Sequence, residues 1–126
     1  MFRKKSEIKP TYFAQCHGGK GTVAARHLFT RADSACGFNF MQDTIVPVGA
    51  SIGPHRHIRN EEVYYLLEGE AVIIIDDIRY PMHPGDVTMV KDGQVHEFVN
   101  VGDIDVRIIV VEAGEPIESE NIRREK

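Results

Sequence analysis

The sequence lacks any apolar stretch long enough to cross a membrane. The longest apolar run, AVIII at 71–75, is far shorter than a membrane span. The N-terminus MFRKKSEIKP is basic, but no apolar segment follows it, so a secretory signal is not expected. These features predict a cytoplasmic protein that is not inserted in a membrane.

Cysteine is also scarce, with only Cys16 and Cys36 in the chain. Two thiols in a chain without a signal sequence are typical of reduced cytoplasmic residues and not of a disulfide framework. A Cys16–Cys36 bridge is the alternative.

The chain has no excess of basic residues, since its formal net charge is −4 with both signs spread along it. Nothing here resembles the basic stripe that nucleic acid or a lipid surface requires, so neither partner is expected. Its 126 residues suffice for one domain with a core. We predict one domain over 1–126, with a barrel core at about 11–113 and a charged tail at about 114–126.

Helical periodicity is absent, except for a possible turn in the tail. Short runs rich in Val, Ile, Tyr and Phe alternate instead with Gly- and Pro-containing turns, as is typical of strands. These runs lie at 22–29, 37–46, 62–69, 70–76, 86–90, 95–100 and 106–112. Many short strands with such punctuation predict an all-β sandwich or barrel.

Some of these strands are apolar on both faces. In the run at 62–69, Val63, Tyr65 and Leu67 alternate with Tyr64 and Leu66, so neither face is polar. An apolar outer face needs cover from a second sheet or another copy of the chain. Because two-fold dimers are the commonest oligomers, we predict a homodimer.

Two histidines precede one of these strands in the stretch GPHRHIRNEE. Residues two apart share one face of an extended chain, so the imidazoles of His55 and His57 can bind the same metal ion. A turn at IRNE would bring either Glu61 or Glu62 back beside them, and His96 begins a distant strand. Three nitrogens and one oxygen suit a divalent transition metal with open positions. The alternative is that the histidine pair is a chance feature of a polar loop.

At these residues the chain resembles the cupin superfamily, in particular the small bacterial single-domain cupins. The first family motif, G-x5-H-x-H-x3–4-E-x6-G, is matched by Gly49, His55, His57, Glu62 and Gly69. The second motif, G-x5-P-x-G-x2-H-x3-N, is matched by Gly85, Gly93, His96 and Asn100, with Lys91 at the proline position. The spacing to Gly69 selects Glu62 over Glu61.

This resemblance implies an antiparallel double-stranded β-helix, the jelly-roll barrel of cupins. It also implies that His55, His57, Glu62 and His96 hold one divalent metal per chain, which can be Mn, Fe, Ni, Zn, Cu or Co. Because metal binding needs neutral imidazole, we expect metal affinity to fall below about pH 6.5.

A small-molecule site is expected beside the metal. By strand parity Tyr64 and Leu66 follow Glu62 inward and Phe98 follows His96, so Tyr64 and Phe98 are candidate substrate-binding residues. The alternative is that they only fill the core. Arg59 and Lys91 could reach an anionic substrate from the rim, although solvated charge is the simpler role.

Other histidines and one glycine-rich stretch lie outside the motifs. CHGGKGT at 16–22 lacks the G-x4-G-K-[ST] spacing of a phosphate loop and predicts a turn between strands. His17, His27 and His83 are expected at the surface or in structural roles, although His27 shares an alternating face with Val23 and Ala25 and can point inward.

Three functions fit this site, and the catalytic residues stay undefined. The first is a small metal-dependent oxygenase, which needs little beyond the metal and an apolar pocket. The second is a non-redox isomerase or lyase that uses the ion as a Lewis acid. The third is a module that binds a sugar or organic acid without turnover. No acid–base dyad is visible in the sequence, which favours the oxygenase.

Overall fold

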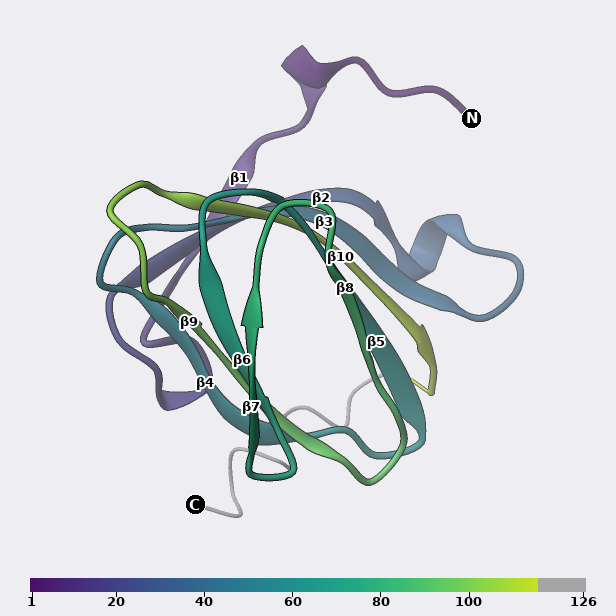
Figure 1. Cartoon of the computed structure of the whole chain (residues 1–126). Helices are drawn as coiled ribbons and strands as arrows, with labels where there is room; N and C mark the ends of the chain where they lie inside the picture. Colours follow the sequence, from purple (N-terminus) through teal and green to yellow (C-terminus); the bar gives the residue numbers. More distant parts are fainter. Residues whose placement is uncertain (116–126) are drawn as a thin grey trace.

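The computed structural model describes residues 1–115, and these residues form an all-β protein (Figure 1). Helix in this part is limited to three short 3-10 turns, η1 (Lys5–Glu7), η2 (Cys16–Gly18) and η3 (Arg31–Asp33). The strands are β1 (Pro10–Ala14), β2 (Thr22–Thr30), β3 (Phe38–Val46), β4 (Ser51–Arg56), β5 (Asn60–Glu68), β6 (Ala71–Ile75), β7 (Ile78–Met82), β8 (Val87–Val90), β9 (Val95–Asn100) and β10 (Val106–Gly114).

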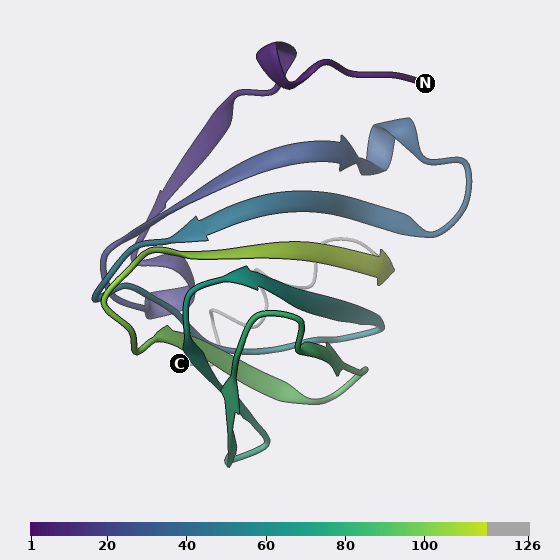
Figure 2. The ribbon, with the colours of Figure 1, turned by 45° about the horizontal axis from the view of Figure 1, so that its top comes forward.

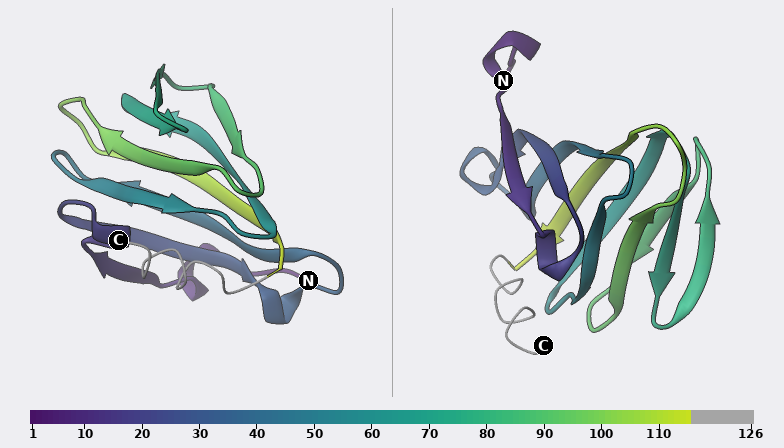
Figure 3. Two further views of the ribbon diagram at one scale, coloured as in Figure 1. Left: turned by 90° about the horizontal axis from the view of Figure 1, so that it is seen from below. Right: turned by 90° about the vertical axis from the view of Figure 1, so that its left-hand side faces the viewer.

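The strands form two antiparallel sheets that face one another. One sheet has the order β1-β2-β3-β10-β5-β8, and the other has the order β4-β9-β6-β7. Figure 2 shows β2, β3 and β10 running side by side as one wall, and Figure 3 shows the same barrel from two further sides. Neighbours such as β3 and β10 are distant in sequence, as in a double-stranded β-helix. The all-β jelly-roll prediction is confirmed.

The predicted strands are present, and three further strands join them. β1 and β7 lie at sheet edges, where a strand needs little apolar patterning, and β4 carries His55 and ends just before His57. β7 contains Pro81, which an edge strand tolerates because it has no further neighbour to donate to. The hairpin before β7 turns at Asp76 and Asp77, both with positive φ, as a two-residue turn of the primed type requires.

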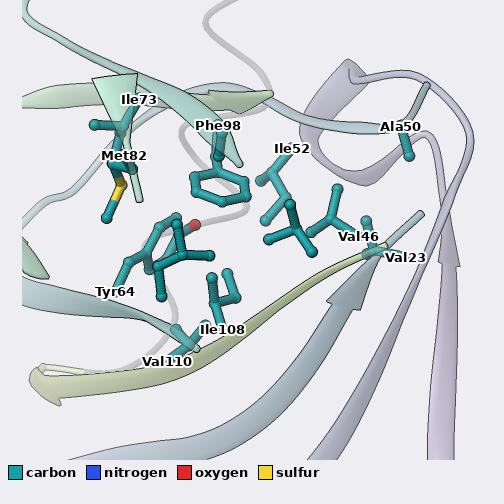
Figure 4. Packing of buried hydrophobic residues seen from close by; sticks show 13 residues of the cluster. Val23, Val46, Ala50, Ile52, Tyr64, Ile73, Met82, Phe98, Ile108 and Val110 are labelled. Atoms are coloured by element: carbon teal, nitrogen blue, oxygen red, sulfur yellow. The ribbon is translucent and has the colours of Figure 1, made fainter. Parts of the chain in front are cut away.

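The core is made by inward-facing residues of both sheets. Along β10 these are Val106, Ile108 and Val110, and along β5 they are Leu66 and Tyr64, all nearly inaccessible to solvent. Figure 4 shows this cluster at close range, with Phe98 and Tyr64 lying in contact from opposite sheets. The core therefore fills one end of the barrel, and the same strands continue from it toward the other end.

The remaining predictions concern the chain ends, the thiols and the membrane. Neither Cys16 nor Cys36 forms a disulfide, as predicted. Among the described residues, no helix is long and apolar enough to span a membrane. The segment before β1 leads away from the barrel (Figure 1). The predicted tail at 114–126 falls almost wholly outside the described residues, so its boundary stays a prediction.

Candidate metal centre

Four side chains meet inside the barrel, three from strands and one from the residue that follows a strand. His55 lies on β4, Glu62 on β5 and His96 on β9, while His57 follows directly after β4. β4 and β9 are paired so that His55 and His96 are directly opposite one another. All four residues are buried, and one ligand atom from each lies within 4.8 Å of the others. The structure therefore brings the four predicted ligands together.

The turn between His57 and Glu62 sets which glutamate points inward. Arg59 adopts the left-handed conformation at this turn, with φ of 58°, although its neighbour Asn60 is of a type that tolerates this conformation more readily. Asn60 instead begins β5 and is buried. Glu62 then faces the histidines, while Glu61 is exposed on the other face. The register agrees with the choice of Glu62 over Glu61.

The nitrogens that face one another are Nε2 atoms. His96 Nε2 lies 3.0 Å from His55 Nε2 and 3.1 Å from His57 Nε2. Glu62 Oε1 lies 3.1 Å from His96 Nε2 and 3.2 Å from His57 Nε2. The carboxylate oxygen is 3.9 Å from His55 Nε2. Four ligand atoms thus converge on one point.

Hydrogen bonds at the far side of two rings fix which nitrogen carries the proton. His55 Nδ1 lies 2.8 Å from the carbonyl oxygen of Gly53, and His57 Nδ1 lies 2.7 Å from Asn60 Oδ1. Both partners are acceptors, so Nδ1 is the donor and the Nε2 lone pair points into the cluster. Such outer partners orient histidine ligands in metal sites. His96 Nδ1 has no hydrogen-bond partner among the described residues.

Without an ion the cluster must share protons to limit repulsion. Burial opposes ionisation of Glu62, but hydrogen bonding by the three histidines holds its pKa well below the usual range. Burial also acts to lower the pKa of His57, yet the hydrogen bond and charge of Glu62 outweigh it, and the net pKa is raised. Burial lowers the pKa of His96 to about 4. Glu62 therefore favours its anionic form in the cluster, and His57 is easier to protonate than His96.

The donor set fits a divalent transition metal. With neutral rings, the cluster places the Nε2 lone pairs of His55 and His57 and a carboxylate oxygen around one point, where a cation would satisfy all three. With the rings neutral, the buried Glu62 Oε1 is left without a hydrogen-bond partner among the described residues. Imidazole with one carboxylate suits Mn, Fe, Co, Ni, Cu or Zn, and no thiolate is present to favour a closed structural zinc site.

A cavity of about 720 Å³ opens onto this cluster. Part of its wall is apolar and is formed by Val23, Ala25, Phe40, Ile52, Tyr64 and Val110. The polar part is formed by Gln15, Arg31, Asn39, Gln42, Thr44 and Glu112. Of the four candidate ligands, His55, His57 and Glu62 line the cavity directly. A molecule in the cavity would therefore lie against the metal site.

Glu112 is a buried carboxyl in this cavity that the sequence analysis missed. Its Oε1 accepts a hydrogen bond of 2.9 Å from Asn39 Nδ2, and its Oε2 lies 3.7 Å from His57 Nδ1. Burial, with the nearby charge of Glu62, raises the pKa of Glu112 to about 7. Alternation along the last strand puts Glu112 in phase with the inward Val106 and Ile108, and this signal could have identified it.

The two aromatic candidates occupy different places. Tyr64 lines the cavity, and burial with the charge of Glu62 raises its pKa well above the usual range. Phe98 is fully buried in the core and contacts Tyr64 with ring centroids 5.4 Å apart. Leu66 is also in the core. The roles of Tyr64 and Phe98 in substrate binding stay predictions.

The predicted cations of the rim lie outside the cavity lining. Arg59 pairs with Glu115, while Arg31, which was not predicted, does line the cavity. Lys91 begins a turn in which its backbone N–H donates to Gln94 Oε1 at 2.9 Å. A proline, as the family motif has here, could not make this bond. The departure at Lys91 is thus compatible with the turn.

The other histidines divide into one surface residue and two inside the barrel. His83 is largely exposed. His27 points inward, as its face predicted, and lies 2.9 Å from Gln42 Nε2 through its own Nε2. His17 lies in the predicted turn at 16–22 and lines the cavity.

Comparison with known proteins agrees with this geometry. Residues 43–112 match the sequence profile of the cupin domain. The chain is 32% identical over 111 residues to an oxalate-binding protein of Thermotoga maritima, covering 88% of this chain and 92% of the relative. A crystal structure described as a predicted oxalate decarboxylase from Thermotoga maritima superposes with a TM-score of 0.87 and 30% identity, covering 91% of this chain and 100% of that one.

A second solved structure is the polyketide cyclase RemF from Streptomyces resistomycificus. It has a TM-score of 0.75 and 26% identity, and the match covers 93% of this chain and 82% of that one. The profile match spans β4, which carries His55, the residue His57 that follows it, and β9, which carries His96. The chain therefore belongs to the cupin family.

Proposed function

We propose that this protein binds one divalent metal through His55, His57, Glu62 and His96 and acts on a small organic molecule in the adjoining cavity. The observation that carries the proposal is the convergence of the four buried ligand atoms at the wall of a cavity of about 720 Å³. When bound, the ion would supply Lewis-acid chemistry, or redox chemistry if it is iron, manganese or copper.

The metal part of the proposal is tested by metal content. Purified protein is loaded with Mn²⁺, Fe²⁺, Co²⁺, Ni²⁺, Cu²⁺ or Zn²⁺, dialysed and analysed by plasma mass spectrometry. About one ion per chain is expected for the wild type and for Glu61→Gln, because Glu61 is exposed on the opposite face. Much less is expected for His57→Ala. A wild type that takes up none of these ions would refute the proposal.

The polar wall favours a non-redox reaction. Glu112 lies outside the ligand set, and its Oε2 is 3.7 Å from His57 Nδ1 in the same cavity. Asn39 donates to the other carboxyl oxygen and so holds the group in place. A carboxylate beside a metal-polarised substrate can accept a proton from it, as isomerases and cyclases require. This position supplies the acid–base partner that the sequence analysis could not find.

The second candidate is an oxygenase, favoured by the apolar part of the cavity wall. Val23, Ala25 and Phe40 could hold a hydrocarbon part of the substrate near the ion. The two reactions differ in their need for oxygen and in their use of Glu112. Turnover that proceeds without O₂ and is lost in Glu112→Gln, while metal content is kept, would support the non-redox reaction. Oxygen consumption that is unchanged in Glu112→Gln would support the oxygenase.

The cavity volume favours a ligand larger than oxalate. Pockets of about 300–1,000 Å³ typically hold drug-sized molecules, and this cavity is about 720 Å³. Calorimetric titration of the Mn²⁺-loaded protein with oxalate and with 1-hydroxy-2-naphthoate compares two oxygen chelators of different size. We expect the bicyclic acid to bind more tightly, through contacts with the apolar wall. Binding of oxalate alone would contradict the size argument.

We also propose that the protein is a homodimer that covers the outer face of the larger sheet. On this face Val63 is paired with Met89 and Val111, while Tyr65 is paired with Val87 and Ile109. Tyr65, Val87 and Met89 are exposed in the single chain. Light scattering at micromolar concentration should give the mass of a dimer, and Tyr65→Glu should shift it toward monomer. A monomeric wild type would count against the proposal.

A further inference from the structure

The loop that enters β2 has two residues with unusual backbone geometry. Gln15 and His17 have φ of 50° and 51°, in the left-handed region that most side chains avoid. Such residues are strained and persist only where the surrounding structure holds them, and strain of this kind often marks functional positions. The loop joins β1 to β2 and contains η2.

Backbone contacts with β4 hold the loop in place. Lys20 N donates to Ser51 Oγ and Ser51 N donates to Lys20 O, both at 2.9 Å. Gly19 in the loop and Gly53 in β4 allow the two backbones to pack in direct contact. A Cβ on Gly19 would lie 2.3 Å from the carbonyl oxygen of Ser51, and one on Gly53 would lie 2.2 Å from that of His17. The loop is thus fixed to the strand that carries His55.

This contact places the ring of His17 flat against the ring of His55. The ring centroids are 3.8 Å apart and the planes differ by 12°. Gly53 serves both rings, since its carbonyl oxygen accepts from His55 Nδ1 and its missing side chain admits the backbone of His17. His55 is therefore held at one edge by a carbonyl group and on one face by an aromatic ring.

The other two histidine ligands have supports of a different kind. His57 has Asn60 at its Nδ1, and the ring of His96 lies 4.9 Å from that of Tyr64 at 36°. The stacked ring that supports His55 comes from a loop outside both family motifs. Relying on the metal site proposed above, we propose that His17 is a positioning residue whose stacked ring fixes the plane of His55 and so sets the affinity and geometry of the metal centre.

The test compares variants that remove or keep the aromatic ring. His17→Asn and His17→Gly lack the ring but tolerate a left-handed backbone, so folding should survive in at least one. His17→Phe keeps a flat ring and removes the nitrogens. His83→Asn is the matched control, because His83 is largely exposed and outside the cavity lining. Each protein is titrated with Co²⁺ against a competing chelator, and the visible spectrum of bound Co²⁺ is recorded.

We expect His17→Asn and His17→Gly to bind Co²⁺ about three- to tenfold more weakly, the range that an aromatic pair supports, and with an altered spectrum. His17→Phe should stay within about twofold of the wild type, with the wild-type spectrum, and His83→Asn should be unchanged. A purely structural role would lower the melting temperature of the metal-free protein without changing the spectrum of the folded fraction.

Three results would overturn the inference. Wild-type affinity and spectrum in the ring-deleted variants would show that the stacked ring does not position His55. Loss in His17→Phe equal to that in His17→Asn would show that a nitrogen of His17 acts, and not its ring. If wild type and His83→Asn take up no Co²⁺, the proposed metal site fails and this inference fails with it, which distinguishes that failure from the first two.

Discussion

The two ends of the barrel interior are built from the same strands but differ in chemistry. Along β10 the inward side chains change from Val106 and Ile108 to Glu112, and along β5 they change from Leu66 to Glu62. One end, here called the closed end, is therefore a packed apolar core. The other, the open end, holds the two buried carboxyls beside the histidines. One strand thus supplies stability at one end and side chains of a buried polar cluster at the other.

In the metal-free protein, the two ends should contribute to the free energy of folding with opposite sign. Burying an aliphatic or aromatic side chain stabilises the fold by about 1.5–3 kcal/mol. Burying a carboxylate costs free energy unless it is paired. In the described part of the chain, the ion-pair contacts of Glu62 are with histidine nitrogens that a bound metal would use instead. The closed end should thus hold the metal-free protein together, while the open end becomes favourable when an ion binds.

The largest expected effect lies at the closed end. Phe98→Ala should lower the free energy of unfolding by about 3–5 kcal/mol, because Phe98 is fully buried and its removal leaves a cavity. Urea denaturation of the metal-free protein measures this. Val101→Ala is the control, and since Val101 is exposed it should cost less than about 0.5 kcal/mol. Equal effects of the two changes would contradict the assignment of the core.

The next effect is the stabilisation that metal gives to the open end. Wild type should gain about 2.7 kcal/mol of unfolding free energy at a free metal concentration of 100 times Kd. His96→Ala should lose this gain and remain folded without metal, because the closed end is intact. Urea curves with and without added ion measure both values. A variant stabilised as strongly as the wild type would show that His96 is not a ligand.

Within the open end, the two neighbouring glutamates should behave differently. Glu62→Gln should weaken metal binding at least about tenfold, since it removes the one anionic ligand. Glu61→Gln should leave affinity nearly unchanged, because Glu61 is exposed on the other face of β5. Chelator competition measures both. The reverse outcome would mean that β5 is shifted by one residue.

The smallest expected effect on stability comes from an ion pair on the outer face of the barrel, between Arg107 and Asp43. Arg107 donates two hydrogen bonds to Asp43, at 2.9 and 2.7 Å, and these lower the pKa of Asp43 although partial burial opposes the shift. A lowered pKa means that the pair stabilises the fold above the unfolded pKa of about 3.8. This contribution is lost as pH falls below that value through the lower folded pKa.

Asp43→Asn should therefore reduce unfolding free energy by no more than about 1 kcal/mol at pH 7, since Arg107 is partly exposed. The difference from wild type should shrink as pH falls below about 4. Urea curves between pH 2.5 and pH 7 measure this. A difference that does not depend on pH would show that lost packing, and not the ion pair, causes the effect.

Local patterns in the sequence determined most of the fold and the four-residue cluster. Runs of β-branched and aromatic residues between glycine turns predicted seven strands in their observed places, because side-chain alternation is a property of the local chain. The spacing of His55, His57 and Glu62 likewise reflects a single strand, turn and strand. Edge strands such as β1 and β7 were missed, since an exposed edge needs no apolar pattern.

Tertiary structure alone decided what surrounds the ligands. Asn39 and Glu112 meet because β3 and β10 are neighbours in the larger sheet, although they lie far apart in sequence. His17 reaches His55 because Gly19 and Gly53 let two backbones touch. Local periodicity predicts which face a side chain occupies. Which side chain lies opposite depends on strand pairing, which is fixed only when the whole barrel closes and buries its core.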